Sequence, residues 1–270
     1  MSLGDIVSLG GRVPTPPEVA TLRLTVAGSA AAWSREPGHA SSSYLLELGR
    51  RAIVLDLGQG AFSALSAFRD PARLDAVLVS HLHPDHCIDL VPLRHYLRFG
   101  CIPARSLMLH APADLPARID ALTGQPDFLG ELVGPPLEGG DFEVAGFAVA
   151  VAPVLHVGPS YAFRVAPAAS PDAPGLVYSG DVGRVEDVLP LIREGDTLLI
   201  EASFADGPIE EGPNHLNAQE AARAAVEGRA RRLILTHILD GYARGAALEA
   251  ARRVFPGESL LAEPGLRVEF

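Results

Sequence analysis

The sequence contains no lysine and only two cysteines, Cys87 and Cys101, among its 270 residues. Two cysteines provide no disulfide framework, and such scarcity is typical of proteins kept in a reducing cytoplasm. No apolar run approaches the length of about 18 residues that a membrane span needs. The first 18 residues lack the charged-then-apolar layout of a secretion signal. We therefore expect a cytoplasmic protein without a membrane partner.

Several common enzyme signatures are also missing. Gly58-x-Gly60 follows a strand-like run, but Ser63 stands where a dinucleotide-binding loop has its third glycine. No Gly-x-Ser-x-Gly elbow of a serine hydrolase occurs, and nothing resembles a phosphate loop. With 33 acidic against 22 basic residues, the net charge is −11. This charge argues against a broad face for long nucleic acids but leaves room for a local basic pocket.

Length and composition are those of one folded α/β unit. Apolar residues make up 48% of the chain, which is enough for a large buried core. Residues 1–20 are rich in glycine and proline, and we interpret them as an N-terminal extension. Residues 21–270 then form a single domain, because no linker divides them.

Strand-like and helix-like segments alternate along this domain. Asn217, with Glu220 three residues later, has the pattern of a helix N-cap. The order suits two sheets packed face to face with helices outside, although alternation alone equally allows a doubly wound sheet. We expect strands near 22–26, 44–48, 52–55, 76–79, 147–155, 162–165, 176–179, 198–201 and 233–236, and helices near 61–69, 88–98, 112–122, 185–193, 218–227 and 246–253.

The most informative segment is His81-Leu82-His83-Pro84-Asp85-His86, which follows the apolar run at residues 76–79. In an extended segment alternate side chains share a face, so His81 and His83 can converge on one cation. Pro84 ends the extension and lets Asp85 and His86 turn towards a neighbouring position. Imidazole and carboxylate groups together suit zinc, manganese or iron. A solvated polar loop is the alternative, and the spacing argues against it.

Three further candidate ligands stand where apolar runs end. His156 follows the run at residues 147–155, Asp181 follows Ser179-Gly180, and His237 follows residues 233–236. Each alone has a structural explanation, as a capping aspartate or a histidine at a strand edge. Their shared position favours a common metal site.

With Asp56 in Val54-Leu55-Asp56-Leu57-Gly58, these motifs resemble the metallo-β-lactamase superfamily in order, from about residue 22 to the end. The resemblance implies an αββα sandwich and two divalent transition-metal ions, with zinc expected and manganese or iron as alternatives. It also implies that Asp56 orients the ligand loop from behind. The implied ligands are His81, His83 and His156 for one ion and Asp85, His86 and His237 for the other, with Asp181 bridging them.

Within the superfamily, two segments resemble the phosphodiesterase branch that contains ribonuclease Z. Glu201-Ala202-Ser203-Phe204 is similar to the His-Glu-Ala-Thr-Phe stretch of that enzyme. Residues 215–222, His-Leu-Asn-Ala-Gln-Glu-Ala-Ala, are similar to its His-Ser/Leu-Thr-Ala-x-x-Ala-Ala segment. The resemblance implies that His215 acts as a general acid for the leaving oxygen, alongside Asp85 in the catalytic centre. Glu201 is expected to fix His215 or a ligand. A surface histidine near a helix start is the alternative for His215.

The segment between His156 and Asp181 is too short for the long arm with which ribonuclease Z grips tRNA. The chain is instead similar to arm-less bacterial cyclic-nucleotide phosphodiesterases. We therefore predict hydrolysis of a small phosphodiester. The alternatives are tRNA 3′-end processing, hydrolysis of a lactone, thioester or β-lactam at the same centre, and metal holding without turnover. A homodimer, common in this superfamily, stays open.

Overall fold

The structure is a computed structural model that describes residues 21–208 and 215–270. The expected N-terminal extension, residues 1–20, lies outside the described residues. Most strands of the first half, joined by the last strand of the chain, make one sheet in the order β13-β1-β2-β3-β4-β5. Its strands are β1 (Leu22–Gly28), β2 (Ser43–Leu48), β3 (Arg51–Leu55), β4 (Ala76–Leu78), β5 (Met108–His110) and β13 (Arg267–Glu269).

The second half makes the other sheet, in the order β12-β11-β10-β9-β8-β7-β6. Both sheets are mixed, because β3, β4 and β5 are parallel to one another, as are β9 to β12, whereas the remaining pairs are antiparallel. The strands are β6 (Gly140–Val144), β7 (Phe147–Pro153), β8 (Tyr161–Pro167), β9 (Leu176–Tyr178), β10 (Thr197–Glu201), β11 (Arg232–Thr236) and β12 (Glu258–Leu261).

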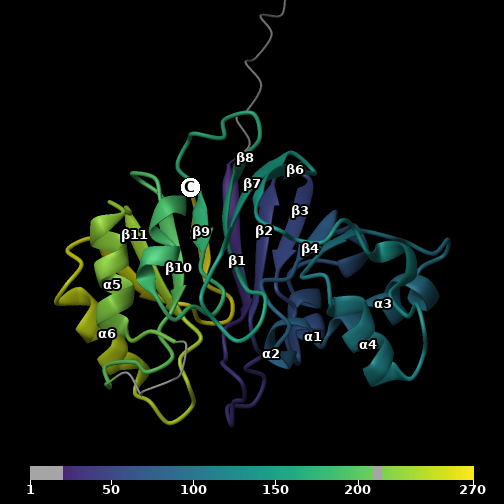
Figure 1. The fold of residues 1–270 in the computed structure, drawn as a ribbon, viewed down its shortest axis with the longest axis horizontal. Coiled ribbons are helices and arrows are strands. Elements are labelled where there is room, and N and C mark those ends of the chain that lie inside the picture. The colour runs from purple at the N-terminus through teal and green to yellow at the C-terminus, as the bar shows by residue number, and fades with distance from the viewer. Residues whose placement is uncertain (1–20, 209–214) are drawn as a thin grey trace, which may run out of the picture.

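Helices cover the outer face of each sheet (Figure 1). On the first sheet lie α1 (Ala61–Ser66), α2 (Pro84–Cys87), α3 (Leu90–His95) and α4 (Leu115–Thr123), with the short turns η1 (Pro71–Arg73), η2 (Tyr96–Gly100) and η3 (Gly130–Leu132). On the second lie α5 (Ala218–Glu227), α6 (Arg244–Arg252), η4 (Val185–Asp187) and η5 (Leu189–Leu191).

Three apolar layers hold the sheets and helices together. The central layer lies between the sheets and includes the fully buried rings of Tyr44, Phe147, Phe163 and Tyr178. One outer layer packs α1, α3 and α4 on the first sheet, and the other packs α5 and α6 on the second. Burying both faces of both sheets accounts for the apolar composition. The expected αββα sandwich is confirmed.

Several segments differ from the sequence prediction. The helix expected at 185–193 is two 3-10 turns, η4 and η5, because Pro190 has no N–H to continue a helix. The helix expected from residue 88 begins earlier, inside the histidine motif, and is divided between α2, α3 and the π-turn η2. The short strands β5, β6, β12 and β13 were not predicted. In contrast, α5 has the expected bounds and its Asn217–Glu220 capping box is present.

Candidate metal centre

The candidate ligands stand at one edge of the two packed sheets, where parallel strands end. His81 follows β4, Asp181 follows β9 and His237 follows β11, while His156 lies in the β7–β8 connection. Asp85 and His86 are carried by α2, which begins directly after His83. Parallel strands place their carboxyl ends together, so residues far apart in sequence meet here. All seven residues predicted as ligands are brought together.

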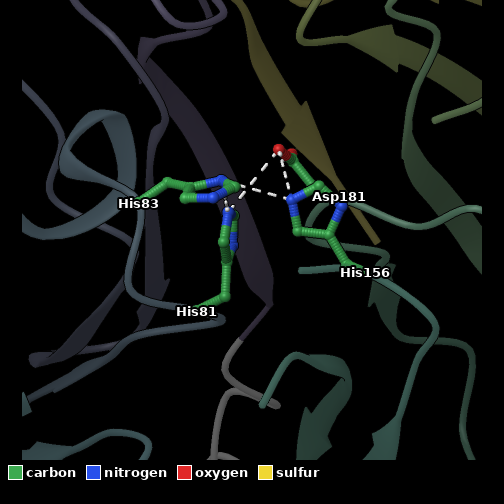
Figure 2. A group of neighbouring side chains, drawn as sticks. All are labelled: His81, His83, His156 and Asp181. Carbon is green, nitrogen blue, oxygen red and sulfur yellow. Dashed lines mark hydrogen bonds and ion pairs between the residues drawn. The ribbon is translucent and has the colours of Figure 1, made fainter. Parts of the chain in front are cut away.

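One group contains His81, His83, His156 and Asp181, whose ligand atoms lie within 4.8 Å of one another. Figure 2 shows the three rings converging on the carboxylate. The Nδ1 of His83 is 3.0 Å from His81 Nε2 and 3.2 Å from His156 Nε2. Asp181 Oδ2 is 3.6 Å from His81 Nε2 and 3.7 Å from His156 Nε2.

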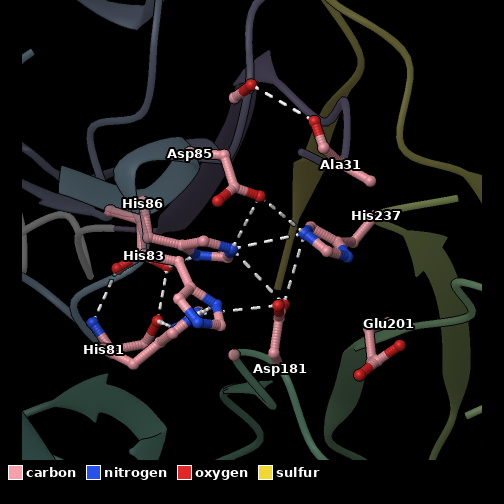
Figure 3. Close-up of polar contacts among 12 residues, drawn as sticks. Ala31, His81, His83, Asp85, His86, Asp181, Glu201 and His237 are labelled. Atoms are coloured by element: carbon pink, nitrogen blue, oxygen red, sulfur yellow. Dashed lines mark hydrogen bonds and ion pairs between the residues drawn. The ribbon is translucent and has the colours of Figure 1, made fainter. Parts of the chain in front are cut away.

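A second group contains Asp85, His86 and His237 (Figure 3). His237 Nε2 is 3.1 Å from Asp85 Oδ2 and 3.3 Å from His86 Nε2. Asp181 lies between the two groups, because its other oxygen, Oδ1, is 3.4 Å from both His86 Nε2 and His237 Nε2. This oxygen is buried, yet no described residue donates a hydrogen bond to it. A buried carboxylate oxygen without a donor is the kind of atom that a cation satisfies.

Hydrogen bonds on the far side of three rings direct their Nε2 atoms into the centre. His86 Nδ1 donates to Asp56 at 2.7 Å, since a carboxylate can only accept. Ser80 Oγ donates to Asp56, so it accepts from His81 Nδ1 at 3.1 Å. Ser203 Oγ likewise donates to Glu201 and lies 3.1 Å from His237 Nδ1. Metal-binding histidines have this arrangement, with the outer nitrogen bonded and the inner one available.

The charge of the centre also fits cations. Asp56, Asp85 and Asp181 are all buried, and within the described chain no arginine forms an ion pair with any of them. Burial raises the pKa of Asp181, but the nearby histidines His237, His86 and His81 together lower it by more. The net pKa of Asp181 is therefore well below the usual range. Burial lowers the pKa of His81 and of His83, which favours neutral imidazoles. A centre of buried carboxylates and imidazole groups suits divalent cations.

Asp56 lies behind the second group and holds its surroundings through four hydrogen bonds. It accepts from Ser80 N at 2.6 Å, Ser80 Oγ at 2.7 Å, His86 Nδ1 at 2.7 Å and Tyr178 Oη at 2.6 Å. Its own backbone is left-handed, with φ at 58°. Such a conformation is costly for a residue other than glycine, and a dense hydrogen-bond network can hold it. These contacts place Asp56 directly behind the candidate ligand His86, and its orienting role stays a prediction.

Glu201 occupies the equivalent place on the second sheet. Its fully buried carboxylate accepts from Ser203 Oγ at 2.6 Å, His215 Nδ1 at 2.8 Å and Val182 N at 2.9 Å. Ser203 in turn contacts His237 at 3.1 Å. Glu201 therefore contacts His215 directly, and it is linked to the candidate ligand His237 through the hydroxyl of Ser203.

His215 lies at the rim of the centre, between the rings of His156 and His237, whose centroids are 4.9 and 5.8 Å away. Its Nδ1 is 4.0 Å from Asp181 Oδ2, so it also belongs to a third possible metal group with Asp181 and His237. However, Nδ1 is already bonded to Glu201. Burial lowers its pKa, but the hydrogen bond and charge of Glu201 raise it more, to about 9.

Sequence reasoning missed Tyr178, Ser80 and Ser203, which complete the hydrogen-bond networks. Each is within three residues of a motif residue, but hydroxyl groups are common at strand ends and carry no local signal of their partners.

Gly58 has a steric role beside the centre. A Cβ on Gly58 would lie 2.0 Å from the carbonyl oxygen of Asp85, so this position requires glycine. Among the described residues, no helix combines the length and apolar character needed to cross a bilayer.

Comparison with known proteins identifies the family. Residues 51–238 match the family model of the Beta-lactamase superfamily domain. The uncharacterized protein ML1173 of Mycobacterium leprae is 33% identical over 248 residues, which cover 88% of this chain and 85% of that protein. Ribonuclease Z of Haloarcula marismortui is 27% identical over 309 residues, covering 93% of this chain and 98% of the relative.

The probable metallo-hydrolase YhfI of Bacillus subtilis is 28% identical over 232 residues, covering 84% of this chain and 91% of YhfI. Its crystal structure superimposes with a TM-score of 0.82 at 24% identity, covering 93% of this chain and 100% of that one. YhfI therefore has the same metallo-β-lactamase fold, and the superposition covers all but a small part of this chain.

Proposed function

We propose that this chain is a dinuclear phosphodiesterase for a small phosphodiester such as a cyclic nucleotide. The chain belongs to the metallo-β-lactamase superfamily and is a metal-dependent hydrolase. The observation that carries the proposal is the position of His215. The buried carboxylate of Glu201 holds this ring beside both candidate metal groups. A hydrolase of good leaving groups needs no such residue, whereas expulsion of an alkoxide does.

His81, His83 and His156 would hold one divalent ion, and Asp85, His86 and His237 the other, with Asp181 shared. Two such ions, when bound, lower the pKa of a shared water and stabilise charge on the oxygens of a displacement. Zinc is the metal expected from this donor set, with manganese and iron as alternatives. The separate contacts of the two Asp181 oxygens support the sharing.

His215 would protonate the departing oxygen through Nε2. Its Nδ1 is bonded to Glu201 at 2.8 Å, which fixes both the ring orientation and the tautomer. No described residue hydrogen-bonds to Nε2, so this atom can serve the substrate. Glu201 is the positioning residue in this arrangement and does not itself touch the substrate.

The region between His156 and Asp181 supports a small substrate. It consists of β8, a loop over residues 168–175 and β9, with no inserted arm. Its single cationic residue, Arg164, is buried and paired with Asp196 at 2.8 Å. A long phosphate backbone needs several cationic contacts, and this region offers none.

A second candidate function is tRNA 3′-end processing. The sequence similarity to a ribonuclease Z along nearly the whole of that relative favours it. The two candidates differ in substrate size, and one assay separates them.

The test is an activity panel on protein reconstituted with zinc and, separately, manganese. The panel contains cyclic nucleotides, bis-p-nitrophenyl phosphate, lactones, a thioester, a β-lactam and a precursor tRNA. We expect turnover of a cyclic nucleotide and of the nitrophenyl diester, and none by an Asp181→Ala protein purified in parallel. Turnover confined to lactones, thioesters or β-lactams would contradict the proposal. Cleavage of precursor tRNA alone would favour the second candidate, and no turnover at all would leave a metal-holding role.

A further inference from the structure

We propose that a hollow at the opposite end of the first sheet binds a small anion that carries two or more phosphoryl groups. The hollow has a volume of about 970 Å³ and lies where β3 begins, beside η1 and the segment that precedes β5. Its charged lining consists of Arg50, Arg51, Arg69, Arg73, Arg105 and Asp75.

The lining has a charge opposite to that of the protein. Five guanidinium groups face a single carboxylate, although the chain as a whole has a net charge of −11. Two other carboxylates stand nearby: Glu47 pairs with Arg69 at 2.9 Å, and Asp70 interacts electrostatically with Arg73 and Arg105. Asp70 is already bonded to Ala72 N and Tyr96 Oη. Five arginines against these three carboxylates leave a surplus of positive charge, which a bound anion would neutralise.

Arg69 acts as the scaffold of the hollow. Its guanidinium donates to the backbone oxygen of Arg50 at 2.8 Å and to that of Arg73 at 3.1 Å. It also bonds to Glu47, and its side chain is only 16% exposed. Arg69 therefore joins the β2–β3 turn to η1, and so fixes the backbone of two other arginines.

Three arginines remain available to a ligand. Arg51 is engaged by Asp75 at 2.8 Å. The exposed residues Arg50, Arg73 and Arg105 donate no side-chain hydrogen bond and form no ion pair within residues 21–208 and 215–270. They approach the same hollow from the β2–β3 turn, from η1 and from the segment before β5.

Guanidinium groups match phosphoryl oxygens in shape as well as charge, because each presents paired N–H donors in one plane. Three of them around one hollow suit a compact ligand with several phosphoryl charges. An extended nucleic-acid backbone would call for a stripe of cations over the surface instead. The hollow is open to solvent, so binding should weaken as salt increases.

This site is separate from the metal centre. β3 and β4 lie side by side, and α2, which carries Asp85 and His86, lies at their far end (Figure 1). β3 begins at Arg51 in the hollow and leads to Asp56 behind the centre. At about 3.3 Å per residue, these two positions are roughly 17 Å apart. An anion in the hollow does not reach the metal ligands.

The test uses inorganic diphosphate as the probe and the full metal-loaded protein. Arginine-directed labelling with phenylglyoxal, followed by peptide mass spectrometry, is carried out with and without diphosphate. We expect at least fivefold slower labelling of Arg50, Arg73 and Arg105, and unchanged labelling of Arg229, which is exposed on the second half of the molecule. Equal protection everywhere, or none, would overturn the proposal.

Diphosphate can also contact transition metals, so calorimetry compares wild type with the double variant Arg73→Gln/Arg105→Gln at equal metal content. We expect the double variant to bind one diphosphate fewer, or at least tenfold more weakly, and to keep its basal hydrolase activity. The matched control is Arg223→Gln/Arg229→Gln, at two exposed arginines of the second half of the chain, which should bind as wild type does. Identical binding by wild type and the double variant, or protection by an RNA oligonucleotide but not by diphosphate, would refute the small-anion assignment. The labelling and calorimetry readouts do not depend on the hydrolytic substrate.

Discussion

Two buried carboxylates support the candidate centre from opposite sheets, and their partners differ. Asp56 follows β3 of the first sheet, and Glu201 ends β10 of the second. Both are fully buried and both accept hydrogen bonds from backbone and side-chain donors. The Asp56 network consists of Asp56, Ser80, His81, His86 and Tyr178, and the Glu201 network consists of Glu201, Ser203, His215 and His237.

The histidines of the Asp56 network are both candidate ligands, so we expect this network to act on metal binding alone. The Glu201 network holds one candidate ligand, His237, through Ser203, but it also holds His215, which stands outside the ligand set. Under the proposed function the two networks would differ: the first would set metal affinity, whereas the second would also place a proton donor. The following predictions test this division.

The largest effect is expected from Asp181→Ala, which removes the group that faces both halves of the centre. Bound metal should fall from two ions per chain, and hydrolysis should drop by more than ~100-fold, since even partners behind the ligands contribute 10–100-fold. Circular dichroism should show a retained fold. Asp172→Ala, at an exposed aspartate paired with Arg193, is the control. Full activity of Asp181→Ala would refute a shared ligand.

Asp56→Asn should act chiefly on metal affinity. An asparagine presents an N–H₂ group to donors that need an acceptor, so His86 loses the bond that directs its Nε2 inward. We expect metal affinity to fall by ~10–100-fold, measured by competition with a chelator. Excess metal should restore much of the activity. Failure of excess metal to rescue turnover would show that Asp56 does more than hold ligands.

Glu201→Gln should act chiefly on turnover. The substitution keeps the size of the side chain but weakens the bond that orients His215. Hydrolysis of a cyclic nucleotide should fall by ~10-fold, a fraction of what a complete general acid contributes. Hydrolysis of a nitrophenyl ester and metal content should change much less. Equal loss of metal in Glu201→Gln and Asp56→Asn would abolish the proposed difference between the networks.

Tyr178→Phe should have the smallest effect. It removes one of four donors to Asp56, a donor that comes from the opposite sheet. The expected cost is ~1 kcal/mol in unfolding free energy, measured by chemical denaturation, with only a few-fold loss of metal affinity. Tyr44→Phe is the matched control, because Tyr44 is equally buried but bonds to Thr236 instead. If both variants lose the same metal affinity, Tyr178 has no special connection to Asp56.

Much of the fold and the positions of the candidate ligands could be predicted from local patterns. Apolar runs that end in histidine or aspartate marked the strand exits at His81, Asp181 and His237, because buried parallel strands are continuous apolar segments. The cap at Asn217 was equally local. The segment at 185–193 was misread because its apolar residues have helical spacing, while Pro190 and the engagement of Asp187 by Leu155 N favour tight turns.

The hydrogen-bond networks could not be predicted in the same way. The Tyr178 hydroxyl meets Asp56 across the inter-sheet core, 122 positions away in the sequence. Ser203 contacts His237 only because β10 and β11 pair in parallel register. Likewise, the arginine hollow joins the β2–β3 turn to residues before β5. Such contacts depend on the packed arrangement of segments, and no single segment records them.

The most direct test of the account compares two leaving groups in His215→Ala. A poor alkoxide leaving group needs a proton as the bond breaks, whereas nitrophenolate leaves without one. We predict that the variant loses ~10²–10⁴-fold in turnover of a cyclic nucleotide and far less with bis-p-nitrophenyl phosphate. Metal content should be unchanged, and His95→Ala, at an exposed histidine, should resemble wild type. An equal loss with both substrates, or loss of metal, would contradict the general-acid role of His215.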